Sequence, residues 1–482
     1  MAQLHKNIGF AGIGQFIYTV LAFALIPFAS RYLGDEGFGI YSLATAIGFF
    51  VALFTDLGIA TLLTREISKH PRIAQPLFAT FMGVKSLLVL ISIAILLLYL
   101  RVGDFDTISI HSILIFSIAS ILLSYTQNAF SVFRGFEKIQ YESIGMSVEK
   151  LLSVVLGILF LVLKWDIRIF ISSFLIAAII KLIMSFYILK RQFIPIAFSV
   201  RLHRSRILLL HSIPFGISVL LAVCYNYMDI LMLHAMTTMQ VVGWYSGSYK
   251  FLSLTTQVNT VLTTAFLPQL SKTARQIDAL TSLFLKGVTM IFMISMPMVP
   301  VVLLYADWMV MTLLGGQFQG SIVSLKLLVF AAFAQMLNSF FVAMYAAINK
   351  QKIIIYFQIV GLILNLVFNL ILIPVISYRG AAIATIVTEW SILLLTIFWA
   401  VKYIFSQGNE WKRFGGMVLR LAGSTALTTL SLWLLRRFHC PDFPALVIGF
   451  AVYVLCLQVL GVIDFRALSQ SFTRFVTPGN RS

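Results

Sequence analysis

Charged residues are scarce in this sequence, and acidic residues are the scarcest of them. Only 11% of the 482 residues are charged, against the roughly 25% typical of soluble globular proteins. Hydrophobic residues make up 60% of the chain, and its mean hydropathy is +0.97. A soluble chain of this length cannot bury that much apolar surface in one core. The composition therefore excludes a soluble protein and indicates one whose outer solvent is lipid.

The sequence also lacks the patterns that hold metals or form disulfide frameworks. Cys224, Cys440 and Cys456 show no metal or redox spacing, and the seven histidines show no zinc spacing. We therefore predict no metal and no cofactor. A net charge of +18 suggests nucleic-acid binding in a soluble protein, but here Lys and Arg lie in short gaps between apolar runs. We predict no nucleic-acid partner.

Long apolar runs dominate what is present. A helix needs roughly 20 apolar residues to cross a hydrocarbon core about 30 Å thick. The first run is too long for the core of a signal peptide, so we expect it to stay as a membrane helix. The fold class is all-α integral membrane, with about fourteen transmembrane helices. The predicted spans are 8–30, 38–63, 76–100, 108–132, 143–163, 167–189, 208–233, 242–267, 283–304, 322–348, 353–376, 381–401, 414–435 and 443–463.

The distribution of Lys and Arg over the gaps predicts the orientation. Basic residues concentrate in alternate gaps and at both ends, and the richest gap is 190–206. Cytoplasmic loops retain Lys and Arg, so we predict a multi-pass protein of the cell inner (cytoplasmic) membrane with both termini cytoplasmic. The gaps on the other side are short and leave no room for an outer domain.

A constant offset of 204 residues relates the two halves of the chain. It superposes the first span on the seventh and the second on the eighth, in the same orientation. The pairs with identical residues are Gly12 and Gly216, Gly39 and Gly243, Tyr41 and Tyr245, and Ser42 and Ser246. Two parallel six-helix lobes follow, with a pseudo-two-fold axis along the membrane normal. The predicted parts are an N-terminal lobe (1–190), a cytoplasmic basic linker (191–207), a C-terminal lobe (208–402), and helices 13 and 14 with a cytoplasmic tail (403–482).

Two stretches resemble a known family. Residues 31–68, RYLGDEGFGIYSLATAIGFFVALFTDLGIATLLTREIS, resemble the opening signature of O-antigen-type polysaccharide flippases, which belong to the multidrug/oligosaccharidyl-lipid/polysaccharide exporter superfamily. Residues 348–387, with Asn365, Asn369 and Gly380, are similar to the second-half signature. The resemblance implies two lobes in a V around a central cavity. It also implies a flippase that moves undecaprenyl-diphosphate-linked oligosaccharide repeat units from the inner to the outer leaflet by alternating access.

The eighth span carries the clearest polar pattern. A lysine at the centre of a membrane helix costs about 2.5–3.5 kcal/mol, so Lys250 favours a wet cavity over lipid. The small residues of the same stripe are equally compatible with close helix packing. Seven residues share one helix face at steps of three and four: Gly243, Ser246, Lys250, Ser253, Gln257, Thr260 and Thr264.

Lysines within the predicted spans are the main candidates for binding substrate. An excess of basic groups suits an anionic cargo such as a diphosphate, which would otherwise lose its hydration without a partner. The residues predicted to bind substrate are Lys250, Lys85, Lys181, Arg31, Arg65, Gln257 and Ser253. Arg31 and Arg65 are included because they stand in the family signature. Lys326 and Arg420 lie near span ends, where a long side chain can reach the headgroups.

Three acidic residues are the candidates for ion coupling: Asp56, Glu389 and Asp229. The 204 offset maps Asp56 onto Thr260, which lies on the polar stripe. An interhelical ion pair that only holds two helices together is the alternative for Asp56. Asp229 lies near the outer end of its span, where it could be merely interfacial. The coupling ion is left open between H⁺ and Na⁺.

The expected partners are the lipid-linked oligosaccharide, built on undecaprenyl diphosphate, and membrane lipid. Polysaccharide assembly proteins are further candidates. The alternative functions are a lipid II flippase and a drug/cation antiporter of the same superfamily, although an antiporter would favour an acidic cavity. The remote alternative is a polyprenyl-dependent membrane glycosyltransferase, because Asp35 and Glu36 form an acidic pair in the first outer gap. Such enzymes have a large outer domain, so we expect no enzyme.

Overall fold

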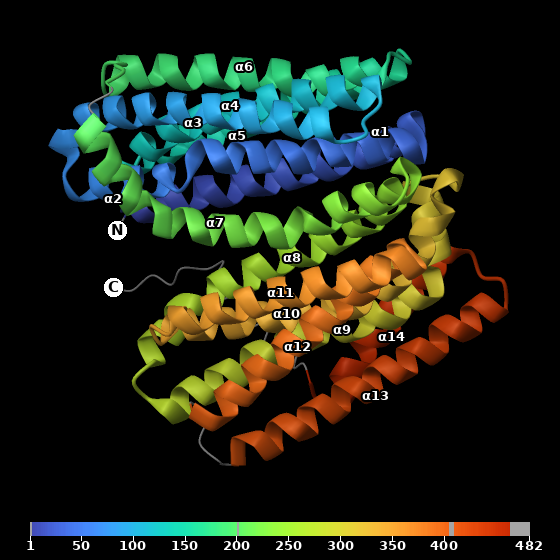
Figure 1. Ribbon diagram of the computed structural model, residues 1–482. Coiled ribbons are helices and arrows are strands. Elements are labelled where there is room, and N and C mark those ends of the chain that lie inside the picture. Colours follow the sequence, from blue (N-terminus) through green and yellow to red (C-terminus); the bar gives the residue numbers. More distant parts are fainter. Residues whose placement is uncertain (1, 200–201, 404–408, 463–482) are drawn as a thin grey trace. The chain divides into compact units, whose positions relative to one another are not determined.

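The computed structural model describes residues 2–199, 202–403 and 409–462, and all of its regular structure there is helical (Figure 1). Apolar runs become helices because a helix satisfies every backbone hydrogen bond within itself. The α-helices are α1 Ala2–Asp56, α2 Ile59–Lys69, α3 Ala74–Val102, α4 Thr107–Gly135, α5 Ile139–Val162, α6 Ile167–Gln192, α7 Leu202–Met236, α8 Met239–Thr273, α9 Ile277–Leu313, α10 Gln319–Ala347, α11 Gln351–Ile376, α12 Tyr378–Tyr403, α13 Asn409–Arg437 and α14 Asp442–Val459.

The all-helical membrane fold predicted from the sequence is confirmed. Twelve helices of the described residues are long and apolar enough to cross a membrane. One of them, the 43-residue part of α1 from Gly14 to Asp56, is about twice the length that one crossing requires. Gly34, with φ 71° and ψ −177°, interrupts its helical backbone, so α1 holds the first two predicted spans. The polar helix α8 is not among the twelve, because its stripe lowers its hydropathy.

The second predicted span, 38–63, is wrong in one respect. The helix breaks at Leu57 and Gly58, which have φ values of 41° and 81°, and α2 then continues as a short separate helix. A Cβ on Gly58 would lie 2.4 Å from the backbone nitrogen of Gly216 in α7. The break therefore lets the backbones of α1 and α7 approach, a constraint that the apolar pattern of one span does not contain.

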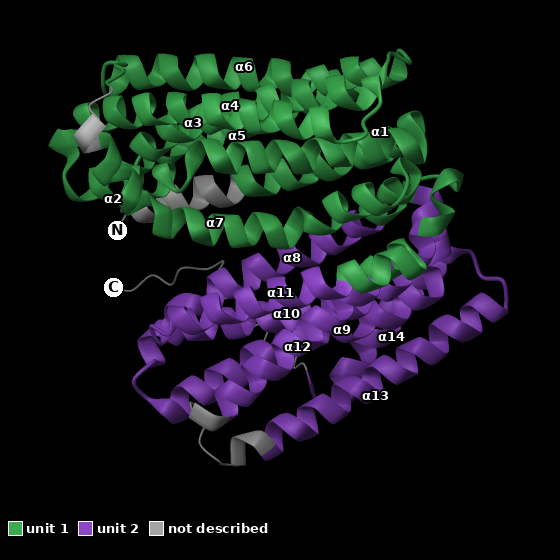
Figure 2. Cartoon of the chain, in the orientation of Figure 1, with its two compact units in different colours: residues 1–247, 313–320, 369–381 green, residues 248–312, 321–368, 382–482 purple. Residues whose placement is uncertain are grey.

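The chain forms two compact units (Figure 2). Unit 1 comprises residues 1–247, 313–320 and 369–381. In it α4 packs against α1, α2 and α6, and α5 packs against α1 and α6. Its core holds the buried aromatic side chains of Phe78, Phe81, Phe130 and Phe133.

Unit 2 comprises residues 248–312, 321–368 and 382–482. Its core joins Phe284 of α9, Phe340 and Tyr345 of α10 and Leu393 of α12. Helices α13 and α14 pack against one another, and Tyr453 of α14 donates a hydrogen bond to the carbonyl of Met293 in α9 at 2.8 Å. Residues 463–482, which include the predicted cytoplasmic tail, and residues 200–201 of the predicted linker lie outside the described residues. The predicted division into lobes stays a prediction.

The second-half signature closes a tight turn between α11 and α12. Ser377 has φ 54°, and a Cβ on Gly380 would lie 2.4 Å from the carbonyl oxygen of Leu372. Only glycine leaves room for that carbonyl, because every other residue places a carbon there. This explains physically why Gly380 stands in the signature.

Candidate functional site

Lys85 of α3 lies at the centre of a fully bonded charge cluster in unit 1. Its side chain is 0% exposed, and its ammonium group donates three hydrogen bonds. These reach Asp56 Oδ1 at 2.8 Å, the carbonyl of Ser124 at 2.7 Å and Asn128 Oδ1 at 2.8 Å. An ammonium group has three donors, so all of them are used. The structure thus brings two predicted site residues, Lys85 and Asp56, into one ion pair between α3 and the end of α1.

Lys181 of α6 belongs to a second buried cluster in unit 1. Its ammonium lies 3.4 Å from Glu149 Oε2 in α5 and 5.3 Å from the centre of the Phe130 ring. Lys181 is 5% exposed and Glu149 is 8% exposed. Next to Glu149 stands Lys150, 9% exposed, whose ammonium lies 4.9 Å from the centre of the Tyr18 ring and 6.0 Å from that of Phe174. Two lysines and one glutamate leave this cluster with one positive charge in excess.

Sequence reasoning missed Glu149 and Lys150. Both lie inside the predicted span 143–163, near the middle of α5. The signal was available, because an acidic and a basic residue at consecutive positions inside an apolar run are expensive to insert unless protein surrounds them. Asn128, which completes the bonding of Lys85, was also missed, and no signal in its own segment marks it.

Asp229 of α7 lies in a third buried cluster of unit 1 and is 5% exposed. Its carboxylate accepts hydrogen bonds from the hydroxyl of Tyr245 in α8 and, at 2.7 Å, from the side-chain amide of Asn369 in α11. Tyr245 and Asn369 both belong to features singled out in the sequence, the 204-residue repeat and the second-half signature. The structure therefore places Asp229 among buried donors, and its role in ion coupling stays a prediction.

Glu389 of α12 lies in unit 2 and is 3% exposed. The side-chain amide of Asn338 in α10 donates to its carboxylate and to its backbone carbonyl, both at 3.0 Å. Thr396 donates to the amide oxygen of Asn338 at 3.4 Å. The Asn338 amide thus bonds the Glu389 carboxylate, and Thr396 in turn bonds that amide. A buried carboxyl group of this kind is a candidate for proton or cation coupling.

The polar stripe of α8 changes character along the helix. Gly243 and Ser246 are buried, Lys250 and Gln257 are half-buried, and three hydroxyl residues are exposed. The exposed residues are Ser253, Thr260 and Thr264. Ser253 donates to the carbonyl of Lys250 at 2.6 Å and Thr260 to that of Thr256 at 2.9 Å, so these hydroxyls are satisfied by their own helix. Lys250, the one charged member of the stripe, and Gln257 thus lie half-buried between the buried and the exposed ends of the stripe.

Arg31 and Arg65 stand at opposite ends of one membrane helix. Arg31 precedes the interruption at Gly34 and is exposed, whereas Arg65 lies in α2, after the helix that ends at Asp56. That helix of about 22 residues separates them by roughly 33 Å. The side chain of Arg65 is 54% exposed and lies 3.8 Å from the carboxylate of Glu66. The two arginines therefore do not share one site within the helix bundle.

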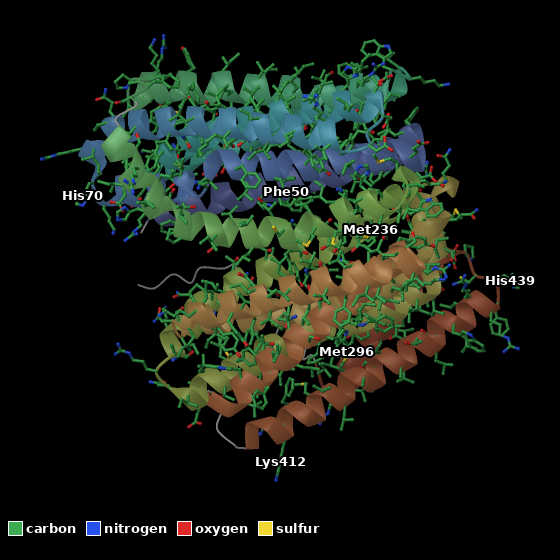
Figure 3. The ribbon with its side chains drawn as sticks, in the orientation of Figure 1. Phe50, His70, Met236, Met296, Lys412 and His439 are labelled. Atoms are coloured by element: carbon green, nitrogen blue, oxygen red, sulfur yellow. The ribbon has the colours of Figure 1, made fainter. Side chains whose placement is uncertain are left out.

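Asp35, one half of the acidic pair that suggested a glycosyltransferase, lies in a bonded cluster of unit 1. Its carboxylate accepts from the indole of Trp244 at 2.9 Å and from the side chain of Gln240 at 2.8 Å. Among the described residues, no group of three or more His, Cys, Asp or Glu side chains comes together as a metal would require. His70 and His439, labelled in Figure 3, each follow the end of a helix.

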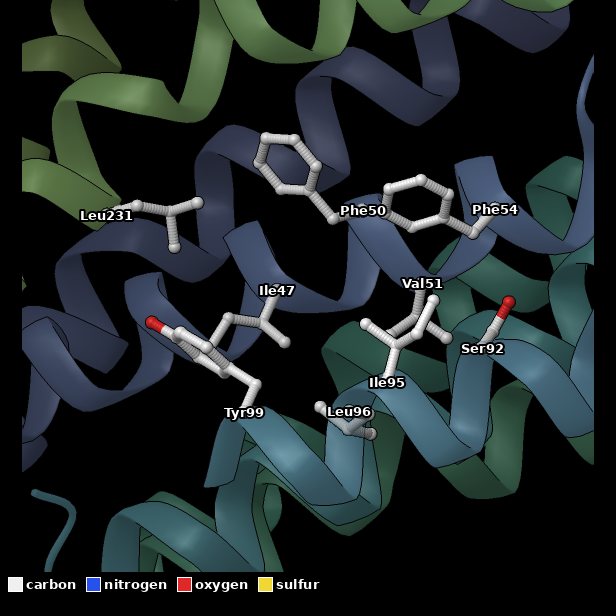
Figure 4. Close-up of a pocket in the computed structure, with 9 residues that line it drawn as sticks. All are labelled: Ile47, Phe50, Val51, Phe54, Ser92, Ile95, Leu96, Tyr99 and Leu231. Carbon is white, nitrogen blue, oxygen red and sulfur yellow. The ribbon is translucent and has the colours of Figure 1, made fainter. Parts of the chain in front are cut away.

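An apolar pocket of unit 1 lies apart from these charges (Figure 4). Helices α1 and α3 supply most of its lining, and α7 adds Leu231. None of the predicted site residues lines it. The pocket therefore suits an apolar chain and has no group that would bind a charged head group. The lining residues are Ile47, Phe50, Val51, Phe54, Ser92, Ile95, Leu96, Tyr99 and Leu231.

A bundle of membrane-spanning helices with bonded carboxylates and lysines in its interior defines a multi-pass membrane transporter. The chain belongs to the polysaccharide biosynthesis protein family, whose profile matches residues 4–274. The family resemblance inferred from the two signatures is thereby confirmed.

Two curated relatives carry related names. The chain is 23% identical over 407 residues to the probable low-salt glycan biosynthesis flippase Agl15 of Haloferax volcanii, covering 80% of this chain and 82% of that protein. It is 27% identical over 188 residues to the putative O-antigen transporter of Escherichia coli, covering 37% of this chain and 45% of that protein. Each relative is named for moving material across a membrane.

Solved structures share the fold. The lipid II flippase MurJ in an inward closed conformation matches with a TM-score of 0.80 at 15% identity, covering 96% of this chain and 99% of that one. An inward-facing multidrug resistance transporter of the MATE family matches with a TM-score of 0.66 at 15% identity, covering 85% and 98%. At this identity the likeness establishes the fold, and the cargo has to be argued from the residues of this chain.

Proposed function

We propose that this protein flips undecaprenyl-diphosphate-linked oligosaccharide repeat units from the inner to the outer leaflet of the cytoplasmic membrane by alternating access. The observation that carries the proposal is basic charge held inside membrane helices, at Lys150, Lys181 and Lys250. Burying a cation inside membrane helices costs free energy, and binding an anionic diphosphate would offset that cost. Membership of the polysaccharide biosynthesis family and the names of the two relatives support the same cargo class.

Lys250 is our candidate for holding the diphosphate, with Ser253 and Gln257 beside it on the same stripe. The prenyl tail stays in the bilayer, because hydrocarbon gains nothing by entering a polar cavity. Lys85 is saturated by Asp56 and its other acceptors, so it can bind cargo only in a conformation that breaks this pair. Arg31 and Arg65 then act at the two membrane faces, where they meet the head group on entry or exit.

Asp56, Asp229 and Glu389 are the proposed coupling carboxylates. Each is held by neutral or cationic donors, and a change of protonation or cation occupancy alters the bonding of at least one pair of helices. The driving ion is H⁺ or Na⁺. Polysaccharide assembly proteins are the proposed further partners, and we propose that both termini are cytoplasmic.

The test is complementation of a strain that lacks its O-antigen flippase. Expression of this protein should restore surface polysaccharide and remove the accumulated lipid-linked intermediate. A parallel strain depleted of its lipid II flippase separates the two cargoes, because rescue of that strain alone would overturn the repeat-unit proposal. Efflux of cationic drugs without either rescue would indicate an antiporter instead.

A further inference from the structure

Lys150 is a buried cation that has no hydrogen-bond acceptor among the described residues. Its side chain is nine-tenths buried in unit 1, yet it donates no hydrogen bond and forms no ion pair with any residue in the described part of the chain. Its contacts are the faces of two aromatic rings, Tyr18 at 4.9 Å and Phe174 at 6.0 Å. A cation over an aromatic face is stabilised only partially, and its hydrogens still require acceptors.

The other two buried lysines among the described residues of unit 1 differ from Lys150 in this respect. Lys85 has three acceptors, one of them the carboxylate of Asp56. Lys181 has the carboxylate of Glu149 at 3.4 Å. The charge of each is therefore offset by a partner. Glu149 also acts on Lys150 through its charge, but it gives its hydrogen bond to Lys181. Two lysines therefore share one carboxylate, and one positive charge of the cluster is in excess.

We propose that Lys150 binds a phosphate-type oxyanion, with the rings of Tyr18 and Phe174 orienting the ammonium group. An oxyanion supplies both the negative charge and the acceptors that the ammonium lacks. The source is either the diphosphate of a prenyl-linked lipid or free phosphate. The lipid source rests on the proposed function, whereas the oxyanion site itself does not.

The composition of the cluster fits a cargo site better than a permanent anion site. A single ammonium binds an oxyanion more weakly than a bidentate arginine or a pair of unpaired lysines would. The Glu149 carboxylate repels an anion that moves from Lys150 towards Lys181. Binding is therefore strong enough to admit the anion and weak enough to release it, as transport requires.

The experiment measures binding to the purified full-length protein in nanodiscs by calorimetry. The probes are farnesyl diphosphate and inorganic pyrophosphate. We expect Lys150→Gln to weaken binding at least about tenfold, as the loss of one charge-assisted hydrogen bond implies. Lys150→Arg should retain affinity within about threefold, because it keeps the charge. The matched control is Lys190→Gln, which removes an exposed lysine at the end of α6 and should bind like wild type.

The two probes distinguish the sources. Binding of farnesyl diphosphate alone assigns the site to a lipid head group, and binding of both probes assigns it to the oxyanion itself; either supports the proposal when Lys150→Gln weakens it. Unchanged affinity in Lys150→Gln, or a wild type that binds neither probe, overturns the site. Should Lys150→Gln fail to fold, protection of Lys150 from an amine-reactive reagent by pyrophosphate in the wild type decides instead, and lack of protection overturns it.

The proposed function and the Lys150 site can fail separately. If the protein fails to complement but binds pyrophosphate through Lys150, the proposed repeat-unit cargo is rejected and the proposed Lys150 site is retained. Successful complementation together with unchanged binding in Lys150→Gln removes the site and leaves the function.

Discussion

Gly39 and Gly243 meet at a reciprocal crossing of α1 and α8 within unit 1. A Cβ on Gly39 would lie 2.1 Å from the carbonyl oxygen of Met239, and a Cβ on Gly243 would lie 1.9 Å from that of Asp35. The 204-residue offset that relates Gly39 to Gly243 also relates Asp35 to Met239. Each helix therefore presents the equivalent glycine to the equivalent carbonyl of the other, as a two-fold relation requires.

Gly243→Leu should disrupt this crossing. The leucine side chain would overlap the carbonyl of Asp35, and overpacking of this kind costs about 1–3 kcal/mol or more. We expect a lower melting temperature in detergent and impaired transport. Gly416→Leu is the control, since a Cβ there meets nothing within 4 Å. Equal melting temperatures for the two variants would show that the crossing does not contribute to stability.

Lys85→Met should destabilise the protein by about 3 kcal/mol. It leaves the Asp56 carboxylate without its cation, and we take the low end of the usual range because Asp56 retains 23% of its side-chain surface exposed. Lys85→Met with Asp56→Leu should recover most of the loss. A double-mutant cycle on chemical unfolding measures the coupling. Additive effects, or a loss no larger than that of the exposed Lys190→Met, would contradict a structural ion pair.

The helices could be predicted from the sequence because one physical property, apolar length, decides them. The predicted span 167–189 and the helix Ile167–Gln192 begin at the same residue. The length of an apolar run does not reveal a helix break such as the one at Gly58. That break goes with the close approach of the α7 backbone, which lies far away in the sequence. Helix pairing likewise depends on packing between distant segments.

The candidate site was predictable only as a set of residues. Lys85, Lys181, Asp56 and Asp229 could be singled out because each is a charged residue inside a predicted apolar span, where burying a charge is costly. Their partners followed from no pattern: Asn128 joins Lys85 from 43 positions away, and Asn369 joins Asp229 from 140 positions away. Lys150 and Glu149 were visible in the sequence, but adjacent opposite charges resemble a neutral pair until the structure shows that Glu149 bonds to Lys181.

Asp229→Asn tests ion coupling at the Asp229 cluster. The amide can still accept from Tyr245, so we expect the variant to fold, but it can no longer bind and release a proton or cation. Transport by Asp229→Asn proteoliposomes should lose its dependence on an imposed H⁺ or Na⁺ gradient. Asp104→Asn, at an exposed position, is the control. A gradient dependence identical to that of wild type would assign Asp229 a structural role and leave coupling to Asp56 or Glu389.

Asn369→Leu is the complementary change at the same cluster. It removes the donor that lies 2.7 Å from the buried carboxylate, which should cost about 1–3 kcal/mol because that oxygen loses a bond it cannot replace with water. Thermal unfolding should show the loss, and Asp229→Asn should not share it. Equal losses in both variants would indicate that packing, not the hydrogen bond, dominates there.

The accessibility of the α8 stripe to water tests the site of cargo contact. In a background without the three native cysteines, single cysteines at positions 250, 253 and 257 should react with a membrane-impermeant thiol reagent, because these positions share one helix face. A cysteine at Leu262, which lies on another face of α8 and packs against the core of unit 2, is the control and should react far more slowly. Protection at all three stripe positions in a protein that still transports would place the stripe in contact with lipid or protein.

The charge at position 250 is tested separately, by transport in proteoliposomes at matched expression. If the ammonium of Lys250 holds the diphosphate, Lys250→Gln should lower transport at least about tenfold, as loss of a charge-assisted hydrogen bond implies, and Lys250→Arg should restore most of it. Equal activity of Lys250→Gln and wild type would remove the head-group role, whereas equal impairment of the Gln and Arg variants would show that the shape of the lysine side chain matters and its charge does not.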